Sequence, residues 1–345
     1  MAAQLPGTLL VPGSKVPKAS SFRASIKTIS LATNFHKTIL TLAMVFVVIG
    51  LPACAFGKTS GATQNCYGEA KSAVRIKKIT METMNGRTLP LEMVHPDAPG
   101  KYPLVIFSHG AFASPNRYYA LLKPVAAAGY IVLAPRHLDS EDWDRKERPS
   151  QTEIWESRGE DMSFIISPNS ELAHITAKHG IILDYEHIAA MGHSYGALIA
   201  QIAAGARAIL PTPLNRNPSV KAVIALSPPG ITPNLIDKNG WERMFVPSLT
   251  ITGTADILPG FIDDWKQHKH SYDFAPTGQR WLWVGEGVDH YFGGMIGREK
   301  PAPKKSKALF ERSVATTISF LDAAMDKPLQ CALDEPISGE KLIKD

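Results

Sequence analysis

The stretch that decides the fold runs from Ile188 to Ala200 and reads Ile-Ala-Ala-Met-Gly-His-Ser-Tyr-Gly-Ala-Leu-Ile-Ala. It begins with an apolar run that suits a strand buried on both faces, and it ends in a small-residue helix from Ala197. Between them, Gly192-His193-Ser194-Tyr195-Gly196 fits the pattern G-x-S-x-G. In that context the pattern predicts a nucleophile elbow, a tight turn that lifts the Ser194 hydroxyl above the sheet edge.

Strand and helix patterns alternate on both sides of this segment. Residues 74–94 alternate in polarity around Asn85-Gly86, which predicts an antiparallel hairpin. Continuous apolar runs predict buried strands at 102–108, 130–135, 188–191, 220–226, 247–252 and 280–284. Helix patterns follow Ser114-Pro115 and the capping box at 150–153, and they cover 197–206 and 307–325. We therefore expect an α/β fold, with a mostly parallel central sheet, an antiparallel N-terminal hairpin and helices on both faces.

The acid and the base that such a serine needs should follow it along the chain, after later strands. Asp256 comes just beyond the strand at 247–252, and His290 lies in a glycine-rich loop after the strand at 280–284. The order predicts Ser194 as nucleophile, His290 as general base and Asp256 as the carboxylate that orients the imidazole.

Other residues compete for these roles. Glu286 and Asp289 are alternative acids, but both stand too near His290 in sequence for the usual placement at a strand end. His268 and His270 fall in a polar, lysine-rich helix, where a solvated face is expected.

The chain resembles the α/β-hydrolase superfamily over about residues 74–325. The motifs that carry the resemblance are, in chain order, Ser-His-Gly-Ala-Phe at 108–112, Ala-Pro-Arg-His at 134–137, Gly-His-Ser-Tyr-Gly-Ala at 192–197 and Asp-His-Tyr-Phe-Gly-Gly at 289–294. They are most similar to the dienelactone-hydrolase-like group, which neighbours the platelet-activating-factor acetylhydrolases and the cutinase-like polyester hydrolases. Because position 194 is serine, dienelactone hydrolases with a cysteine nucleophile are excluded.

The resemblance also implies where an oxyanion would bind. It places one half of the oxyanion hole after the first buried strand, at the backbone N–H of Ala111, and the other half at the N–H of Tyr195. Five residues are expected to support the nucleophile and this loop, namely His109, Gly110, Gly192, His193 and Gly196. Four aromatic residues are candidates to line the substrate cleft: Phe112, Trp241, Tyr291 and Phe292. The short segment at 228–247 leaves little room for a lid, which favours a small or exposed ester.

The N-terminal region indicates an export signal. Residues 1–68 contain no Asp or Glu, and a basic stretch precedes an apolar run at 38–56. This pattern predicts a signal peptide over 1–55 that is cut after Ala55, then a short segment at 56–73, a catalytic domain at 74–330 and a C-terminal tail at 331–345. The mature protein would be periplasmic or secreted.

Other interpretations of the leader stay open. Leu51-Pro-Ala-Cys54 resembles a bacterial lipoprotein cleavage box, so the protein could instead be anchored through a lipid on Cys54. An uncleaved anchor, an organelle transit peptide around 14–30 and a start codon assigned too far upstream fit as well.

Charge and cysteine content narrow the class of partner. The net charge is +5, and the basic residues ahead of the expected cut account for the whole excess. The mature chain would be neutral, so we expect no nucleic-acid partner, and no stable membrane span unless Cys54 carries a lipid.

In an exported protein Cys66 and Cys331 could form a disulfide, or they could be unrelated thiols. No Cys-x-x-Cys motif or Cys/His cluster suggests a metal site.

Together these features predict a monomeric serine esterase that needs no cofactor and acts on a small-molecule or polymer ester. Two alternatives remain, which are an amidase or peptidase with the same three residues and a non-catalytic relative that only binds a ligand.

Overall fold

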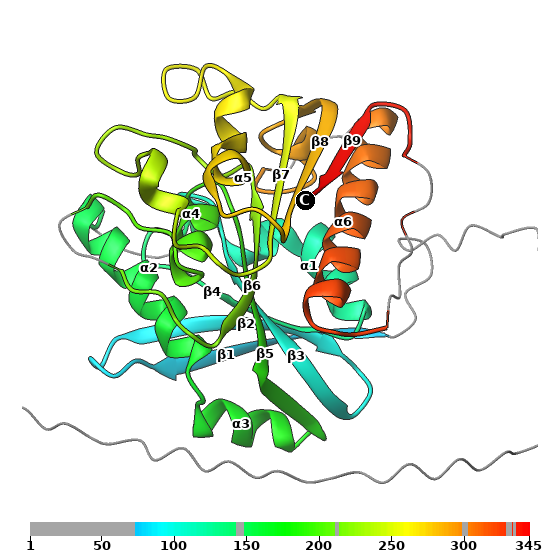
Figure 1. The fold of residues 1–345 in the computed structure, drawn as a ribbon. Coiled ribbons are helices and arrows are strands. Elements are labelled where there is room, and N and C mark those ends of the chain that lie inside the picture. Colours follow the sequence, from blue (N-terminus) through cyan, green and yellow to red (C-terminus); the bar gives the residue numbers. More distant parts are fainter. Residues whose placement is uncertain (1–72, 143–147, 211–213, 299–302, 329–332, 334–335) are drawn as a thin grey trace, which may run out of the picture. The chain divides into compact units, whose positions relative to one another are not determined.

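The structure is a computed structural model that describes residues 73–142, 148–210, 214–298, 303–328, 333 and 336–345. Within these residues one sheet of nine strands runs through the molecule, in the order β1-β2-β4-β3-β5-β6-β7-β8-β9 (Figure 1). The expected signal peptide, the segment at 56–72, Cys54, Cys66 and Cys331 lie outside the described residues. None of the described helices is long and apolar enough to cross a membrane.

The central strands are parallel, and antiparallel strands flank them. β1 (Val74–Glu82), β2 (Thr88–Pro96) and β4 (Ile131–Pro135) pair in antiparallel fashion. The parallel part is made by β4, β3 (Gly100–Ser108), β5 (Ile181–His193), β6 (Val220–Leu226), β7 (Ser248–Ala255) and β8 (Arg280–Asp289). The predicted α/β-hydrolase fold, with its N-terminal hairpin and its mostly parallel sheet, is confirmed.

Helices cover both faces of the sheet because its central strands are apolar on both sides. A short 3₁₀ helix, η1 (Pro115–Tyr118), leads into α1 (Tyr119–Ala127), which packs on one face together with α6 (Lys304–Ala324). The other face is covered by α2 (Gln151–Ile166) and α4 (Tyr195–Ala203), and α3 (Ser170–Ala177) packs on the same side. Short helices occupy connecting segments: η2 (Lys238–Trp241), η3 (Trp265–Lys269), α5 (His270–Phe274) and η4 (Phe292–Gly294).

The C-terminal segment differs from the expectation of a tail outside the domain. Residues Glu340–Lys344 form β9, which pairs antiparallel with β8 and extends the sheet. Buried polar contacts hold it there, since the Glu340 carboxylate accepts hydrogen bonds from the Trp283 indole N–H at 3.0 Å and from Arg312 Nε at 2.8 Å. A five-residue strand rich in charge is typical of a sheet edge. Because its residues are mostly polar, no hydrophobic pattern in the sequence predicts a strand there.

The parallel arrangement decides where the chemistry can occur. Because β3, β5, β7 and β8 all point the same way, their carboxyl ends meet along one edge of the sheet. The loops that leave this edge carry the residues of the predicted site.

Candidate active site

Ser194 lies in a strained turn between β5 and α4. Its backbone has φ 54° and ψ −122°, a region that residues with a side chain adopt only under constraint from their surroundings. The neighbouring glycines allow this turn. A Cβ on Gly192 would lie 2.2 Å from the Gly196 oxygen, and a Cβ on Gly196 would lie 2.1 Å from the Ser108 oxygen. Close packing of backbone against backbone therefore requires glycine at both positions.

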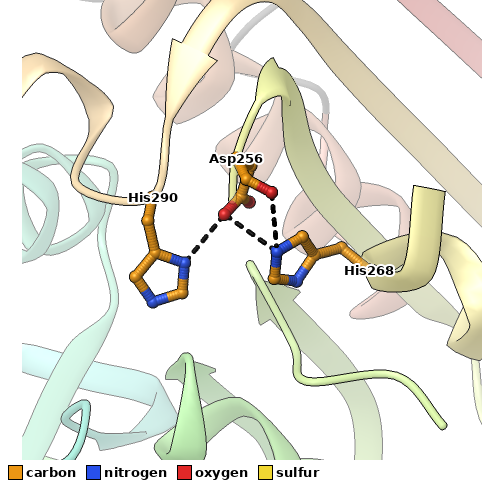
Figure 2. A group of neighbouring side chains, drawn as sticks. All are labelled: Asp256, His268 and His290. Carbon is orange, nitrogen blue, oxygen red and sulfur yellow. Dashed lines mark hydrogen bonds and ion pairs between the residues drawn. The ribbon is translucent and has the colours of Figure 1, made fainter. Parts of the chain in front are cut away.

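His290 and Asp256 meet above the ends of β8 and β7. The Nδ1 of His290 is 2.8 Å from Asp256 Oδ1, and both side chains are buried (Figure 2). Because a carboxylate only accepts, Nδ1 donates, and the neutral ring keeps its lone pair on Nε2. Thr252 Oγ1 donates to the other carboxylate oxygen at 2.8 Å. Sequence order alone had paired these two residues, and the fold brings them into contact.

A second histidine, His268, also contacts Asp256. Its Nε2 is 2.9 Å from Asp256 Oδ1 and 3.1 Å from the Asp256 backbone oxygen (Figure 2). Its Nδ1 is 2.6 Å from the Pro228 carbonyl oxygen. The expectation of a solvated face for His268 is wrong, because the side chain is fully buried. The segment is the 3₁₀ helix η3, which packs against β7. Its lysines reflect only the side of the helix that faces solvent, so they do not reveal the buried side that carries His268.

The electrostatics of this group favour an ionised Asp256. Burial raises the pKa of the Asp256 carboxyl, but hydrogen bonds from His268 and His290 outweigh burial and hold the pKa well below its usual range. Among the described residues, Asp256, His268 and His290 also form a group whose possible metal-ligating atoms all lie within 4.8 Å of one another. The hydrogen bonds between them account for that proximity.

His193 connects the His290 loop to the loop after β3. Its Nε2 donates to the His290 carbonyl oxygen at 2.8 Å, and its Nδ1 accepts from the Tyr118 hydroxyl at 3.0 Å. The Tyr118 oxygen in turn accepts the Gly110 N–H at 2.9 Å. Burial and the nearby His290 lower the pKa of His193 to about 3, so the ring stays neutral and the direction of each bond is determined.

The loop after β3 presents one backbone N–H for a ligand. Gly110 N–H is bonded to Tyr118, and Phe112 N–H donates to Asp139 Oδ2 at 3.2 Å. Between them, Ala111 N–H has no acceptor among the described residues. Tyr195 N–H stands at the first position of α4, where a helix offers no internal partner. The backbone N–H groups of Ala111 and Tyr195, which the resemblance implies for an oxyanion, are therefore both available to a ligand.

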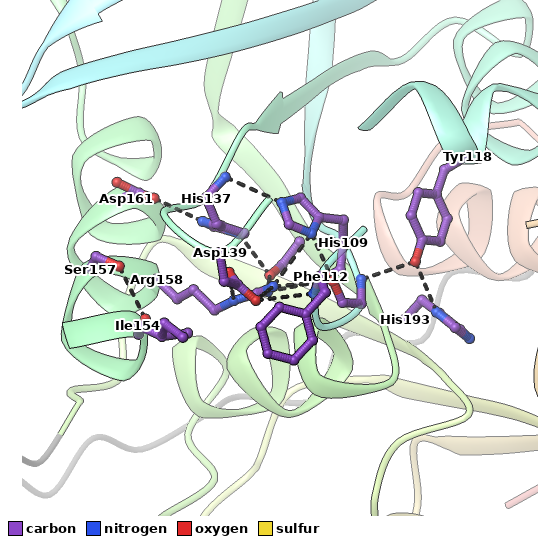
Figure 3. A network of polar contacts seen from close by, with 12 residues as sticks. His109, Phe112, Tyr118, His137, Asp139, Ile154, Ser157, Arg158, Asp161 and His193 are labelled. Carbon is purple, nitrogen blue, oxygen red and sulfur yellow. Dashed lines mark hydrogen bonds and ion pairs between the residues drawn. The ribbon is translucent and has the colours of Figure 1, made fainter. Parts of the chain in front are cut away.

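A buried ion pair supports that loop, and sequence reasoning missed both of its members (Figure 3). Arg158 of α2 contacts Asp139 and donates to the carbonyl oxygens of His109 at 2.7 Å and Gly110 at 3.2 Å. Its guanidinium also stacks over the Tyr195 ring, 5.0 Å from the centroid. Burial raises the pKa of Asp139, but Arg158 outweighs this effect and holds it well below the usual range. Arg158 lies in a helix whose pattern indicates only packing, which is why the sequence does not reveal it.

Beneath the loop lies a fully buried Ser-His-Asp series. His137 Nε2 is 2.9 Å from Ser108 Oγ. His137 Nδ1 is 2.8 Å from Asp161 Oδ2 (Figure 3). Burial raises the pKa of the Asp161 carboxyl to about 6, and the nearby Arg87 cation partly offsets this rise. All three side chains are inaccessible, so this series braces the loop from below and meets no substrate.

A cavity of about 740 Å³ opens over Ser194 and His290. Phe112 and Tyr291 line it, as expected. Trp241 and Phe292, which were also expected there, lie in the core. The Trp241 indole N–H donates to Gln201 beneath α4, and Phe292 packs edge-on against Phe310 of α6. An aromatic side chain suits a cleft and a core equally well, so residue type could not separate these cases.

Parts of this chain are similar in sequence to known proteins. A model of the chlorophyllase family matches residues 62–229, which include the loop after β3 and Ser194 but end before Asp256. Over 49 residues the chain is 45% identical to a Schizosaccharomyces pombe (strain 972) protein named "Putative phospholipase A2". That match covers 14% of this chain and only 11% of the relative.

Among solved structures, similarity is found to a "Putative Dienelactone Hydrolase" from Klebsiella pneumoniae subsp. pneumoniae MGH 78578. The TM-score is 0.48 with 18% identity, over 70% of this chain and 98% of that chain. The sheet order and the elbow agree with the predicted α/β-hydrolase fold, and the chlorophyllase family model supports the resemblance to that superfamily. Chlorophyllase and phospholipase A2 are both names of ester hydrolases.

Proposed function

We propose that this protein is a serine esterase in which Ser194, His290 and Asp256 act as a catalytic triad. The observation that carries the proposal is the buried hydrogen bond between His290 Nδ1 and Asp256 Oδ1, beside a cavity that Ser194 shares. That bond leaves His290 Nε2 free to accept a proton, and a strained turn exposes the nucleophile.

In the first step Ser194 Oγ attacks the ester carbonyl carbon while its proton passes to His290 Nε2. The negative oxygen that forms is stabilised by the N–H groups of Ala111 and Tyr195. Collapse breaks the bond to the alcohol oxygen, which leaves with the proton from His290. Water then repeats the sequence on the acyl-enzyme and releases the acid, so each proton taken up by His290 is returned.

The cavity favours an ester with a sizeable apolar part. Leucines and aromatic residues surround the space beside Ser194, and Arg298 lies at its margin, 4.4 Å from the Tyr291 ring centroid. The names of the relatives suggest substrates to test, which are chlorophyll for the family model and glycerophospholipids for the yeast protein.

A substrate panel on the purified chain tests the proposal. It would contain p-nitrophenyl esters of two to sixteen carbons, matched anilides, a soluble polyester, chlorophyll and a phospholipid. We expect ester hydrolysis that falls at least 10³-fold in Ser194→Ala and is unaffected in the distant serine variant Ser219→Ala. Faster turnover of the anilides would favour the amidase alternative, and undiminished turnover in Ser194→Ala would refute the assignment.

We also propose export of the mature enzyme, from the acid-free leader and the apolar run at 38–56. Sequencing the N-terminus of the protein recovered from outside the cytoplasm would distinguish a start at Phe56 from a lipidated start at Cys54.

A further inference from the structure

Both ring nitrogens of His268 face oxygen atoms that cannot donate a hydrogen bond. Nδ1 is 2.6 Å from the carbonyl oxygen of Pro228, which can only accept. Nε2 faces the Asp256 carboxylate at 2.9 Å and the Asp256 carbonyl oxygen at 3.1 Å. A neutral imidazole has one lone pair, and in either tautomer that lone pair would point at an oxygen lone pair. Neither neutral form fits this pocket unless Asp256 itself carries a proton.

The surroundings of Asp256 argue against a proton on the carboxyl group. Its Oδ1 faces Nδ1 of His290 and Nε2 of His268, and its Oδ2 accepts from the Thr252 hydroxyl. A buried carboxyl group with several donors around it is stabilised as the anion. The proton therefore belongs on His268.

We infer that His268 is a buried imidazolium that shares Asp256 with His290 and so lowers the pH at which His290 becomes a free base. The inference rests on the proposed role of His290 and adds a positioning residue with an electrostatic effect. At rest Asp256 and His268 already neutralise each other. When His290 takes a proton, it becomes a second cation whose ring centroid lies 5.7 Å from that of His268. His290 therefore holds its proton less tightly than it would beside Asp256 alone.

Few other charges act on His268. Asp256 faces it from the end of β7 and His290 from the end of β8. His193 at the end of β5 is kept neutral by burial and by His290. His270 in α5 is half-buried, its pKa is lowered mainly by burial, and its Nδ1 accepts the Ile231 N–H at 3.1 Å. From the segment that follows β6, the Pro228 carbonyl oxygen faces His268 Nδ1.

The pH dependence of kcat/KM tests the electrostatic effect. His268→Gln keeps an N–H donor for Asp256 but removes the positive charge. We expect the midpoint of its acidic limb to move up by about one pH unit. His270→Gln is the matched control, two residues away without contact to Asp256, and its midpoint should stay within about 0.2 units. A uniform loss of rate in His268→Gln with an unchanged midpoint would show a merely structural role and overturn the inference.

A measurement on the unaltered chain keeps the test independent of folding in the variant and of activity. In ¹⁵N-histidine-labelled protein, both ring nitrogens of His268 should show protonated shifts from pH 5.5 to 8.5, and this pair of signals should be absent in His268→Gln. A neutral-ring signature at pH 7 would refute the imidazolium. If the imidazolium is seen but the chain cleaves no ester, the proposed function fails while the charge assignment stands.

Discussion

Arg158 and Asp139 form a buried ion pair in which Nη2 lies 3.0 Å from Oδ2 and Nε lies 3.0 Å from Oδ1. The guanidinium also binds the carbonyl oxygens of His109 and Gly110, and the carboxylate accepts the N–H of Phe112. The pair therefore holds, from both sides, the loop that presents Ala111 N–H to the cavity.

Arg158→Lys should lower kcat for ester hydrolysis about 10²-fold, because lysine keeps the charge but cannot bind the carboxylate and two carbonyl groups at once. KM should change little. Arg158→Met would leave Asp139 buried without its partner and should cost about 3–5 kcal/mol of unfolding free energy. Steady-state kinetics and urea unfolding check both effects. Arg280→Lys, at the edge pair with Asp345, is the control, and wild-type kcat in Arg158→Lys would contradict the positioning role.

Tyr118→Phe should lower both stability and rate. The change removes the acceptor of the Gly110 N–H and the donor to His193 Nδ1, and it leaves a buried N–H unpaired at a cost of about 1–3 kcal/mol. We expect kcat to fall roughly 10-fold, because the His290 loop and the loop after β3 lose their link. Tyr119→Phe, which removes only a bond to Glu92, should keep its kcat, and equal effects in the two variants would argue against the link.

Asp161 should give stability an unusual dependence on pH. Burial raises its pKa to about 6 in the folded chain, against about 3.9 when unfolded. The folded state then binds the proton more tightly, so this group's contribution to stability is present below about pH 4 and is lost as pH rises through 6. Asp139 and Asp256, with lowered pKa values, give the opposite slope.

The difference in unfolding free energy between Asp161→Asn and the wild type isolates this contribution. Between pH 4 and 6.5 the wild type should lose about 2–3 kcal/mol of unfolding free energy relative to Asp161→Asn, and at higher pH the difference should stay constant. Urea unfolding at half-unit steps of pH measures it. A difference that is flat with pH would show that Asp161 titrates at an ordinary value.

Phe112 and Trp241 should separate substrate binding from stability. Phe112 lines the cavity and is 52% exposed, whereas Trp241 is fully buried beneath α4. Phe112→Ala should raise KM for long acyl esters several-fold with a change in melting temperature of under about 2 °C. Trp241→Ala should cost about 3–5 kcal/mol of stability and leave KM unchanged in the folded fraction. A KM effect in Trp241→Ala alone would reverse this assignment.

Short sequence patterns, such as an apolar run or a capping box, predicted the strands and helices that such patterns mark directly. The apolar runs at 220–226 and the capping box at Ser150 both appear where they were expected, as β6 and as the start of α2. Strand ends were less accurate, since β5 begins at Ile181 rather than at 188. The segment at 181–187 alternates in burial and carries charged residues, so it lacks the continuous apolar run of a strand buried on both faces.

The sequence by itself determined the fold class, the elbow and the order of Ser194, Asp256 and His290, because strand periodicity, tight turns and chain order are local properties of the chain. Only the tertiary structure decided that His268 shares Asp256, that Arg158 and Asp139 hold the loop after β3, and that Trp241 packs in the core while Phe112 lines the cavity. These contacts join residues from different elements. Burial and hydrogen-bond partners depend on how the whole sheet brings its edges together, and no short stretch of sequence records that arrangement.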